Sequence, residues 1–217
     1  MFISWASIYE GSTDESYFGA LLPRVLNDLI LSNANRTVDV ADFPAMRFGK
    51  SGKHIDEIAE EICDGMEAFD LLFSHADTGG RSLERTAIAR SMAYAQAAHA
   101  RCGYDVMACF PILPRKEMEA WALTDGHAVC RSLGFRGNPS ELNLPSTARQ
   151  AERLSDPKEI LRLAIGEVKR RVRPSDAARL LTSIAQTQSI ERLRLCASYA
   201  SFERSLSEHL EEKGYYR

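Results

Sequence analysis

Short apolar segments alternate with helix-like segments over the first half of the chain, and this alternation constrains the fold more than any other feature. Residues 2–9, 37–48, 69–73 and 104–110 are predicted as strands, the second of them broken by Pro44. The third lacks polar alternation, which is typical of a strand covered on both faces. The resulting β-α-β-α-β-α-β succession predicts the α/β class, with a doubly wound, mainly parallel four-stranded sheet.

Three helices are expected between these strands. The first begins at Thr13 or Asp14, both of which suit a helix cap, and carries an apolar stripe at helical spacing. Pro23 interrupts that stripe and should kink the helix or shift its start. The second helix has its apolar residues on one face over residues 55–66, and the third is rich in alanine over about residues 81–101.

The pattern changes after the fourth strand. Residues 115–125 look helical, residues 134–147 form a connector rich in Gly, Pro and Asn, and residues 157–212 are predicted as consecutive helices. We therefore expect an α/β domain over residues 1–133, with residues 134–217 as a helical extension packed on the same domain.

Composition is ordinary for a globular protein: the 217 residues are 45% hydrophobic and the net charge is −3. Any contact with nucleic acid must therefore come from a local basic patch. The N-terminal apolar run is too short for a membrane span and lacks a preceding basic region, so we expect a cytoplasmic protein with no membrane partner. The cysteines form no Cys-x-x-Cys pair, which indicates buried or free thiols in a reducing cytosol and argues against a zinc site. They are Cys63, Cys102, Cys109, Cys130 and Cys196.

Acidic residues follow three of the predicted strands. Glu10 ends the first, Asp77 lies just past the third, and Glu119 follows the fourth. In an open α/β sheet, ligands bind outside the carboxyl ends of the strands, so these side chains are expected to meet around one divalent cation. Glu117 lies two residues before Glu119 on a helix and cannot face the same way.

Each of these signals also has a structural explanation. The segment after Glu10 suits a capped helix start, and the Asp77 loop suits a helix entry. His75 is as well explained by a hydrogen-bonded histidine as by a metal ligand. Asp125 either supports the metal site from outside or caps the next turn.

Two basic segments are candidates for nucleic-acid contacts. The loop at residues 47–53 lacks the spacing of a phosphate-binding P-loop, so a backbone contact is expected there rather than a nucleotide site. The cluster at residues 158–179 is suited to neutralising phosphates, and equally to a solvated helix face or a partner surface. The candidate contacts are Arg47, Lys50, Lys53, Arg170 and Arg171.

Glu10 with Gly11, the pair formed by His75 and Asp77, and residues 119–125 resemble the TOPRIM superfamily. The likeness is to a branch related to overcoming-lysogenization-defect nucleases, whose members are often encoded beside ABC-type or AAA-type ATPases in bacterial antiviral defence loci. Residues 156–158 and 194–202 also resemble that branch, so the likeness covers most of the chain.

The resemblance implies a TOPRIM-like fold and a nuclease that uses Mg²⁺ or Mn²⁺ to cut DNA or RNA. Glu10 would then act as acid/base or metal ligand, Asp77 and Glu119 as metal ligands, and Lys158 as a lysine facing phosphate. His75 stands where an aspartate is usual, which removes a negative charge and favours Mn²⁺ over Mg²⁺. The alternative is a catalytically lapsed subunit that binds an ATPase partner in a defence complex; a phosphatase-like enzyme ranks last.

Overall fold

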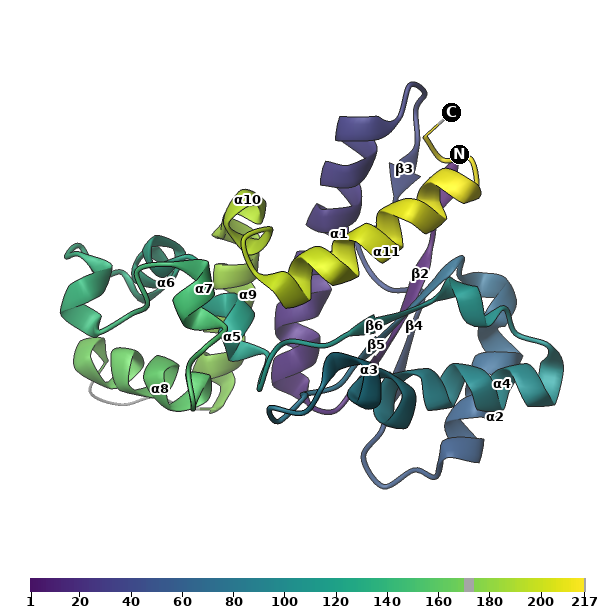
Figure 1. The fold of residues 1–217 in the computed structure, drawn as a ribbon, viewed down its shortest axis with the longest axis horizontal. Coiled ribbons are helices and arrows are strands. Elements are labelled where there is room, and N and C mark those ends of the chain that lie inside the picture. Colours follow the sequence, from purple (N-terminus) through teal and green to yellow (C-terminus); the bar gives the residue numbers. More distant parts are fainter. Residues whose placement is uncertain (170–173, 217) are drawn as a thin grey trace.

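A four-stranded sheet forms the centre of the protein, whose computed structural model describes residues 1–169 and 174–216 (Figure 1). Every neighbouring pair of strands is parallel. The α/β class and the four-stranded parallel sheet predicted from the sequence are therefore confirmed. In spatial order the strands are β4 (Met46–Gly49), β2 (Trp5–Tyr9), β5 (Leu71–His75) and β6 (Cys109–Ile112).

Two of the predicted strands are each divided, and their halves join different sheets. In the first, Ser4 separates β1 (Phe2–Ile3) from β2, because its backbone N–H and its hydroxyl both donate to Asp70 Oδ2 at 2.7 Å. In the second, Pro44 lies between β3 (Asp39–Val40) and β4. β1 and β3 pair in parallel as a separate two-stranded sheet.

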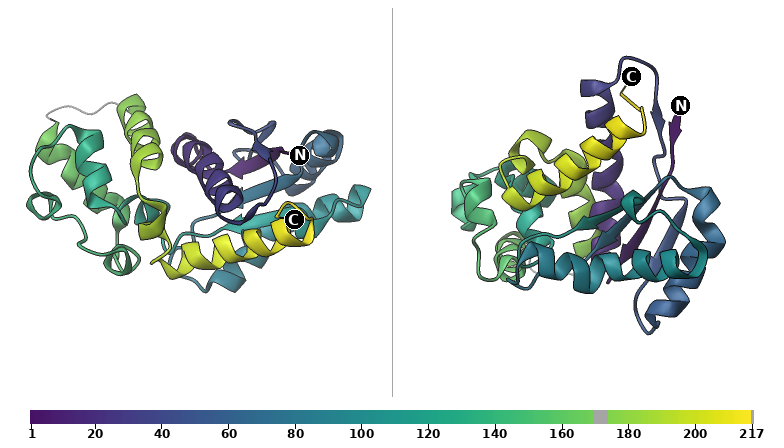
Figure 2. Two further views of the ribbon diagram at one scale, coloured as in Figure 1. Left: turned by 90° about the horizontal axis from the view of Figure 1, so that it is seen from above. Right: turned by 45° about the vertical axis from the view of Figure 1, so that its right-hand side comes forward.

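Helices cover both faces of the main sheet (Figures 1 and 2). α1 (Ser12–Asn33) packs on one face, whereas α2 (Ile55–Gly65) and α4 (Ala93–Cys102) pack on the other. Along β2, Trp5 and Tyr9 belong to the first core, and the intervening Ala6 and Ile8 belong to the second. This alternation is the geometry of a strand buried on both sides.

The predicted start of α1 is two to three residues too late. Gly11 is the residue before the helix, and Asp14 lies in the first turn, where its Oδ2 accepts a hydrogen bond from the Gly11 N–H at 3.0 Å. Pro23 lies inside the helix without ending it. Because proline has no N–H, the carbonyl of Gly19, four residues earlier, lacks its usual helical donor at this point.

The third predicted helix is a composite. It consists of α3 (Leu83–Thr86), the π-helical segment η2 (Ala87–Met92) and α4. Shorter 3₁₀ segments, η1 (Met66–Ala68) and η3 (Val106–Ala108), precede β5 and β6, so that both strands begin later than predicted.

Residues beyond β6 form mostly helices, and their apolar side chains join the core on the α1 face. α9 packs along α1 and α11 returns over β6, so this region shares one core with the sheet (Figure 2). Over the described residues, no helix is long and apolar enough to cross a membrane. The elements are α5 (Glu119–Ala122), α6 (Gly126–Leu133), η4 (Pro139–Leu142), α7 (Ala148–Ala151), α8 (Pro157–Val168), α9 (Pro174–Thr187), α10 (Ile190–Leu193) and α11 (Ala197–Glu212).

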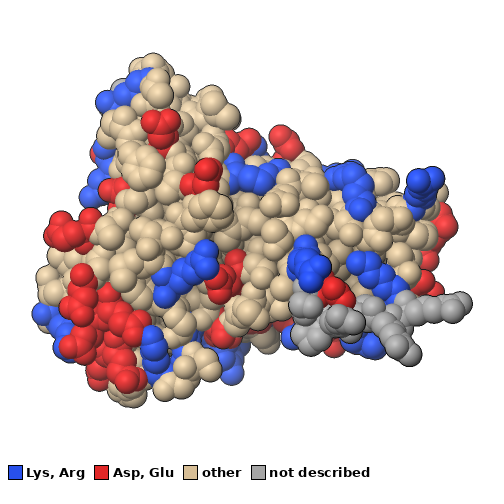
Figure 3. Space-filling view, turned by 180° about the vertical axis from the view of Figure 1, so that it is seen from behind, with Lys and Arg blue, Asp and Glu red and all other residues tan. Residues whose placement is uncertain are grey.

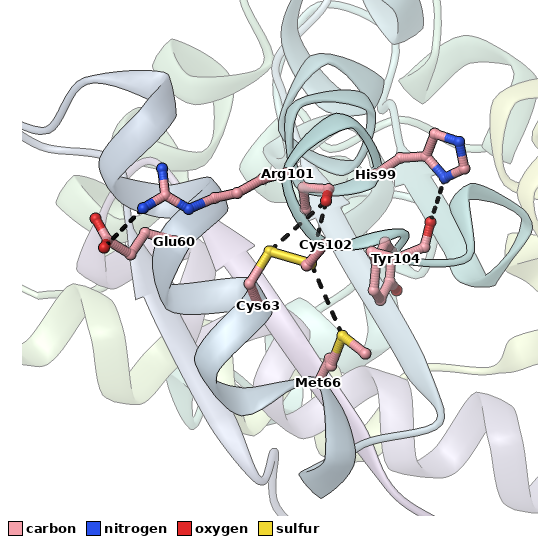
Figure 4. Close-up of a disulfide and its surroundings, with 8 residues drawn as sticks. Glu60, Cys63, Met66, His99, Arg101, Cys102 and Tyr104 are labelled. Carbon is pink, nitrogen blue, oxygen red and sulfur yellow. Dashed lines mark hydrogen bonds and ion pairs between the residues drawn. A yellow bond between two sulfur atoms is a disulfide. The ribbon is translucent and has the colours of Figure 1, made fainter.

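A disulfide joins α2 to α4, which corrects the expectation that all cysteines are free thiols (Figure 4). Cys63 and Cys102 have Cα atoms 6.0 Å apart, within the normal disulfide range. An ion pair between Arg101 and Glu60, at 2.7 Å, links the same two helices. The sequence did not indicate this pairing, because 39 residues separate the two cysteines and only helix packing brings them together. Cys109, Cys130 and Cys196 are free and buried.

Loss of this disulfide should destabilise the fold. Closing a 39-residue loop removes chain entropy from the unfolded state, which corresponds to up to about 4 kcal/mol. Reduction should therefore lower the urea midpoint of the wild-type protein and leave that of the double variant Cys63→Ala, Cys102→Ala unchanged. Equal responses of the two proteins would contradict the disulfide.

Candidate functional site

The strand order reverses between β2 and β5, and the predicted acidic residues lie at this point. From β2 the chain passes through α1 to β4 on one side, and from β5 it passes through α4 to β6 on the other. Glu10 directly follows β2, His75 ends β5, and Asp77 comes two residues later. Such a reversal opens a crevice at the carboxyl ends of the strands, where α/β proteins bind ligands.

His75 is completely buried between two carboxylates. Its Nδ1 lies 3.5 Å from Asp14 Oδ2, and its Nε2 lies 3.3 Å from Asp77 Oδ1. The ring of Phe18, with its centroid 4.7 Å away, packs against the imidazole. Each nitrogen faces one carboxylate, but neither makes a hydrogen bond of good geometry, so the contact of His75 with Asp14 and Asp77 is one of charge.

The pKa values at this contact favour the ion pair. Burial alone would lower the pKa of His75, but the contacts with Asp14 and Asp77 outweigh it and raise the pKa above its usual 6.5. Burial would likewise raise the pKa of Asp14, whereas His75, the Gly11 N–H and Lys50 together lower it. The two carboxylates thus favour the protonated form of the imidazole, and the imidazole favours the ionised form of Asp14.

Two further cations lie beside Glu10. Lys50, the residue after β4, places its Nζ 3.8 Å from Glu10 Oε1 and against the His75 carbonyl, and it lies over the Tyr94 ring. Burial lowers the pKa of Lys50, with Glu10 opposing the shift. Arg90, from the π-helical segment, lies 3.9 Å from Glu10 Oε1 and donates to the Asp77 carbonyl at 3.0 Å.

The Asp77 loop is tied to the segment that follows β6. The Met118 N–H donates to Asp77 Oδ1 at 3.1 Å, and the Lys116 N–H donates to Thr78 Oγ1 at 2.8 Å. In return, the Gly79 N–H donates to the Lys116 carbonyl at 3.0 Å. The contacts of the Asp77 carboxylate with His75 and with the Met118 N–H both involve Oδ1, so Oδ2 takes part in neither.

These bonds place Glu119, the residue after Met118, in a buried position at the same edge of the sheet. Its relative exposure is 9%, and burial raises its pKa to about 7, with Glu117 and Asp77 adding to the rise and Lys158 opposing it. Glu119 and Lys158 line one cavity. The Lys158 N–H donates to Glu117 Oε2 at 3.2 Å, which fixes the start of α8 beside this segment.

The predicted residues are thus gathered at one edge of the sheet without enclosing a single ion. The charge of Asp77 adds to the rise in the pKa of Glu119, whereas Glu10 faces Lys50 and Arg90. Within residues 1–169 and 174–216, no group of at least three His, Cys, Asp or Glu side chains is arranged to hold a metal.

The expected nucleic-acid contacts have varied surroundings. Arg47 is ion-paired with Glu15 at 2.6 Å, and Lys53 is ion-paired with Glu61. Lys50 points into the site and is largely buried. Arg170 and Arg171 lie outside the described residues.

Asp125 has a structural position away from this edge. Its Oδ1 accepts from the Ala128 N–H at 3.2 Å, which caps α6, and its Oδ2 accepts from the Ser189 N–H at 3.1 Å. This agrees with the capping alternative. The sequence analysis missed the pairing of Asp14 with His75 and the presence of Arg90. Of these two residues, only Asp14 could have been found from the sequence. It lies four residues after Glu10, a spacing at which helical side chains are neighbours.

Comparison with protein-family models, with curated protein sequences and with solved structures gave no match to this chain.

The pH dependence of stability should report the His75 ion pairs. Because its pKa is raised, their contribution is fully present below the unfolded value of 6.5 and is lost as the pH rises through the folded value. The free energy of unfolding of the wild-type protein should fall as the pH rises above 6.5, and this fall should be absent in His75→Asn. The exposed His127 offers a matched control, since His127→Gln should keep the wild-type slope. A wild-type slope in His75→Asn would refute the ion pairs.

Proposed function

We propose that this protein is a divalent-metal-dependent nuclease of TOPRIM type that hydrolyses phosphodiester bonds in DNA or RNA. The observation that supports the proposal is that Glu10 and Asp77 follow the two strands between which the strand order reverses, with Glu119 in the segment that is hydrogen-bonded to the Asp77 loop. As part of the proposal, the protein acts in the cytoplasm in bacterial antiviral defence, beside an ABC-type or AAA-type ATPase. In a reducing cytosol the disulfide of Cys63 and Cys102 would be a redox-responsive one.

The donor set suits Mg²⁺ or Mn²⁺ brought in with a phosphate. Such ions are commonly held by one or two carboxylates together with substrate phosphates and waters. Asp77, through its Oδ2, and Glu119 are the residues suited to hold one, while the Met118 N–H and His75 contact the other Asp77 oxygen, Oδ1. A bound ion would supply an activated water and would neutralise charge on the phosphoryl group.

The remaining residues have roles that follow from their surroundings. Glu10 is 40% exposed and its ion pairs are long, so it is free to approach a substrate or accept a proton. Lys158, exposed at the start of α8 beside Glu119, would contact a phosphate oxygen. With a pKa of about 7, Glu119 changes its protonation state near neutral pH, as is common for acid/base residues.

The surface charge limits where nucleic acid would approach. The exposed face of α2 carries Asp56, Glu57, Glu60 and Asp64, and acidic side chains gather at this end of the molecule in Figure 3. Phosphates would be repelled there. Approach from the carboxyl edge of the sheet avoids this acidic face.

The proposal predicts cleavage of nucleic acid by the purified protein with Mn²⁺, alone or with its ATPase partner. Asp77→Asn should reduce the rate by roughly 100-fold or more, because it removes a charged ligand. Glu60→Gln, on the acidic face of α2, is the matched control and should retain the wild-type rate. The measurement is nicking of a supercoiled plasmid and of a labelled RNA. Undiminished cleavage by Asp77→Asn would refute the assignment.

A second candidate is the catalytically lapsed subunit that binds an ATPase partner. It is favoured by the charges of the site, since Lys50 and Arg90 lie beside Glu10, and His75, whose pKa Asp14 and Asp77 raise, lies between those two carboxylates. A site neutralised by its own side chains attracts a cation weakly.

Changing His75→Asp separates the two candidates. The substitution replaces a buried imidazole by a carboxylate between Asp14 and Asp77, so the variant should be less stable without metal and should be stabilised by Mn²⁺. Cleavage by His75→Asp but not by the wild-type protein would indicate the lapsed subunit. Cleavage by the wild-type protein would indicate the nuclease. The readouts are thermal unfolding with and without Mn²⁺ and the same nicking assay.

A further inference from the structure

A cavity of about 400 Å³ lies between α8 and α9, with Glu119 and Thr13 at its border. This volume is in the range of pockets that bind small ligands. Its walls are aliphatic, and among its described lining residues none is aromatic. The aliphatic wall consists of Leu161, Ile165, Ala177, Leu180 and Leu181.

Basic side chains follow the same cavity along α8. Lys158 and Arg162 are four residues apart on α8, which places them on one side of the helix, and Lys169 follows the last residue of α8 and lines the same cavity. Arg162 is neutralised by Glu159, to which it donates two bonds at 2.5 Å. Neither lysine forms an ion pair with another described residue. Glu119, whose pKa burial raises to about 7, is the one acidic residue among the described lining residues, so basic groups outnumber acidic ones beside the aliphatic wall.

The aliphatic wall and the two lysines of this cavity limit the chemical class of ligand that would bind there. A nucleobase gains most from stacking on aromatic rings, and the described wall offers none. A nucleic-acid backbone needs exposed cations but no apolar cavity. An alkyl chain, in contrast, gains free energy by leaving water for contact with leucine and isoleucine side chains.

We propose that this cavity binds a small amphiphile with an alkyl chain and an anionic head group. The chain lies against the aliphatic wall, and the head group, a carboxylate or a phosphate, lies near Lys158 and Lys169. This site goes beyond the nuclease function proposed above, and its occupancy is measurable without any activity assay.

Calorimetric titration of the full chain tests the site. Decanoate and decyl phosphate, below their micellar concentrations, should bind saturably with one molecule per chain, and comparing them shows which head group is preferred. Decyltrimethylammonium should not bind. Lys158→Ala and Lys169→Ala should each weaken decanoate roughly threefold to fivefold. Lys213→Ala, on a lysine paired with Asp105 outside this cavity, should leave the affinity unchanged.

Gly166 provides a variant that closes the cavity and keeps the fold. It lines the cavity from inside α8, and a Cβ atom there meets no heavy atom within 4 Å. Gly166→Phe should therefore abolish binding, whereas Gly166→Ala should bind as the wild-type protein does. Circular dichroism verifies that both variants are folded.

Several results would overturn the proposal. These are absence of saturable binding by both anionic amphiphiles, equal binding of the cationic one, or wild-type affinity in a folded Gly166→Phe. Binding of adenosine monophosphate in place of decanoate would identify a nucleotide site instead.

Discussion

The buried contact of His75 with Asp14 and Asp77 is the interaction on which the edge of the sheet depends. It joins the first turn of α1, the end of β5 and the loop after β5 around a fully buried imidazole. Removing the imidazole would leave the largely buried Asp14 carboxylate without this partner, which is destabilising for a buried charge. The same contact places a residue that the family resemblance assigns to the metal between two carboxylates.

A second set of hydrogen bonds fixes the segment after β6 and the start of α8 relative to the Asp77 loop. Backbone N–H groups of Lys116 and Met118 donate to the Asp77 loop, and the Lys158 N–H donates to Glu117. Glu119 is buried because its two neighbouring segments are fixed in this way, and its raised pKa follows from that burial. Glu119 therefore belongs both to the segment fixed beside the Asp77 loop and to the lining of the cavity along α8.

Much of the fold could be predicted from apolar spacing, because four strands buried on both faces need helices above and below. The errors occurred where one polar group outweighed the pattern. Ser4 divides the first strand by bonding Asp70, and Gly11 rather than Thr13 or Asp14 precedes α1. Glu10 and Asp77 were predicted at one edge since strand ends in a parallel sheet meet there. The sequence did not predict that Lys50 points into the site, because a long side chain after a strand can turn either toward the edge of the sheet or toward solvent.

The sequence by itself determined the α/β class, the parallel sheet and the identity of the acidic residues at its carboxyl edge, because these depend on local periodicity and on order along the chain. Only the tertiary structure decided which charges meet. The pairing of His75 with Asp14, the arrival of Arg90 from a π-helical segment and the disulfide of Cys63 with Cys102 join residues whose separation in the sequence carries no signal. Distances between side chains follow from how helices pack on the sheet, and that packing is a property of the whole core.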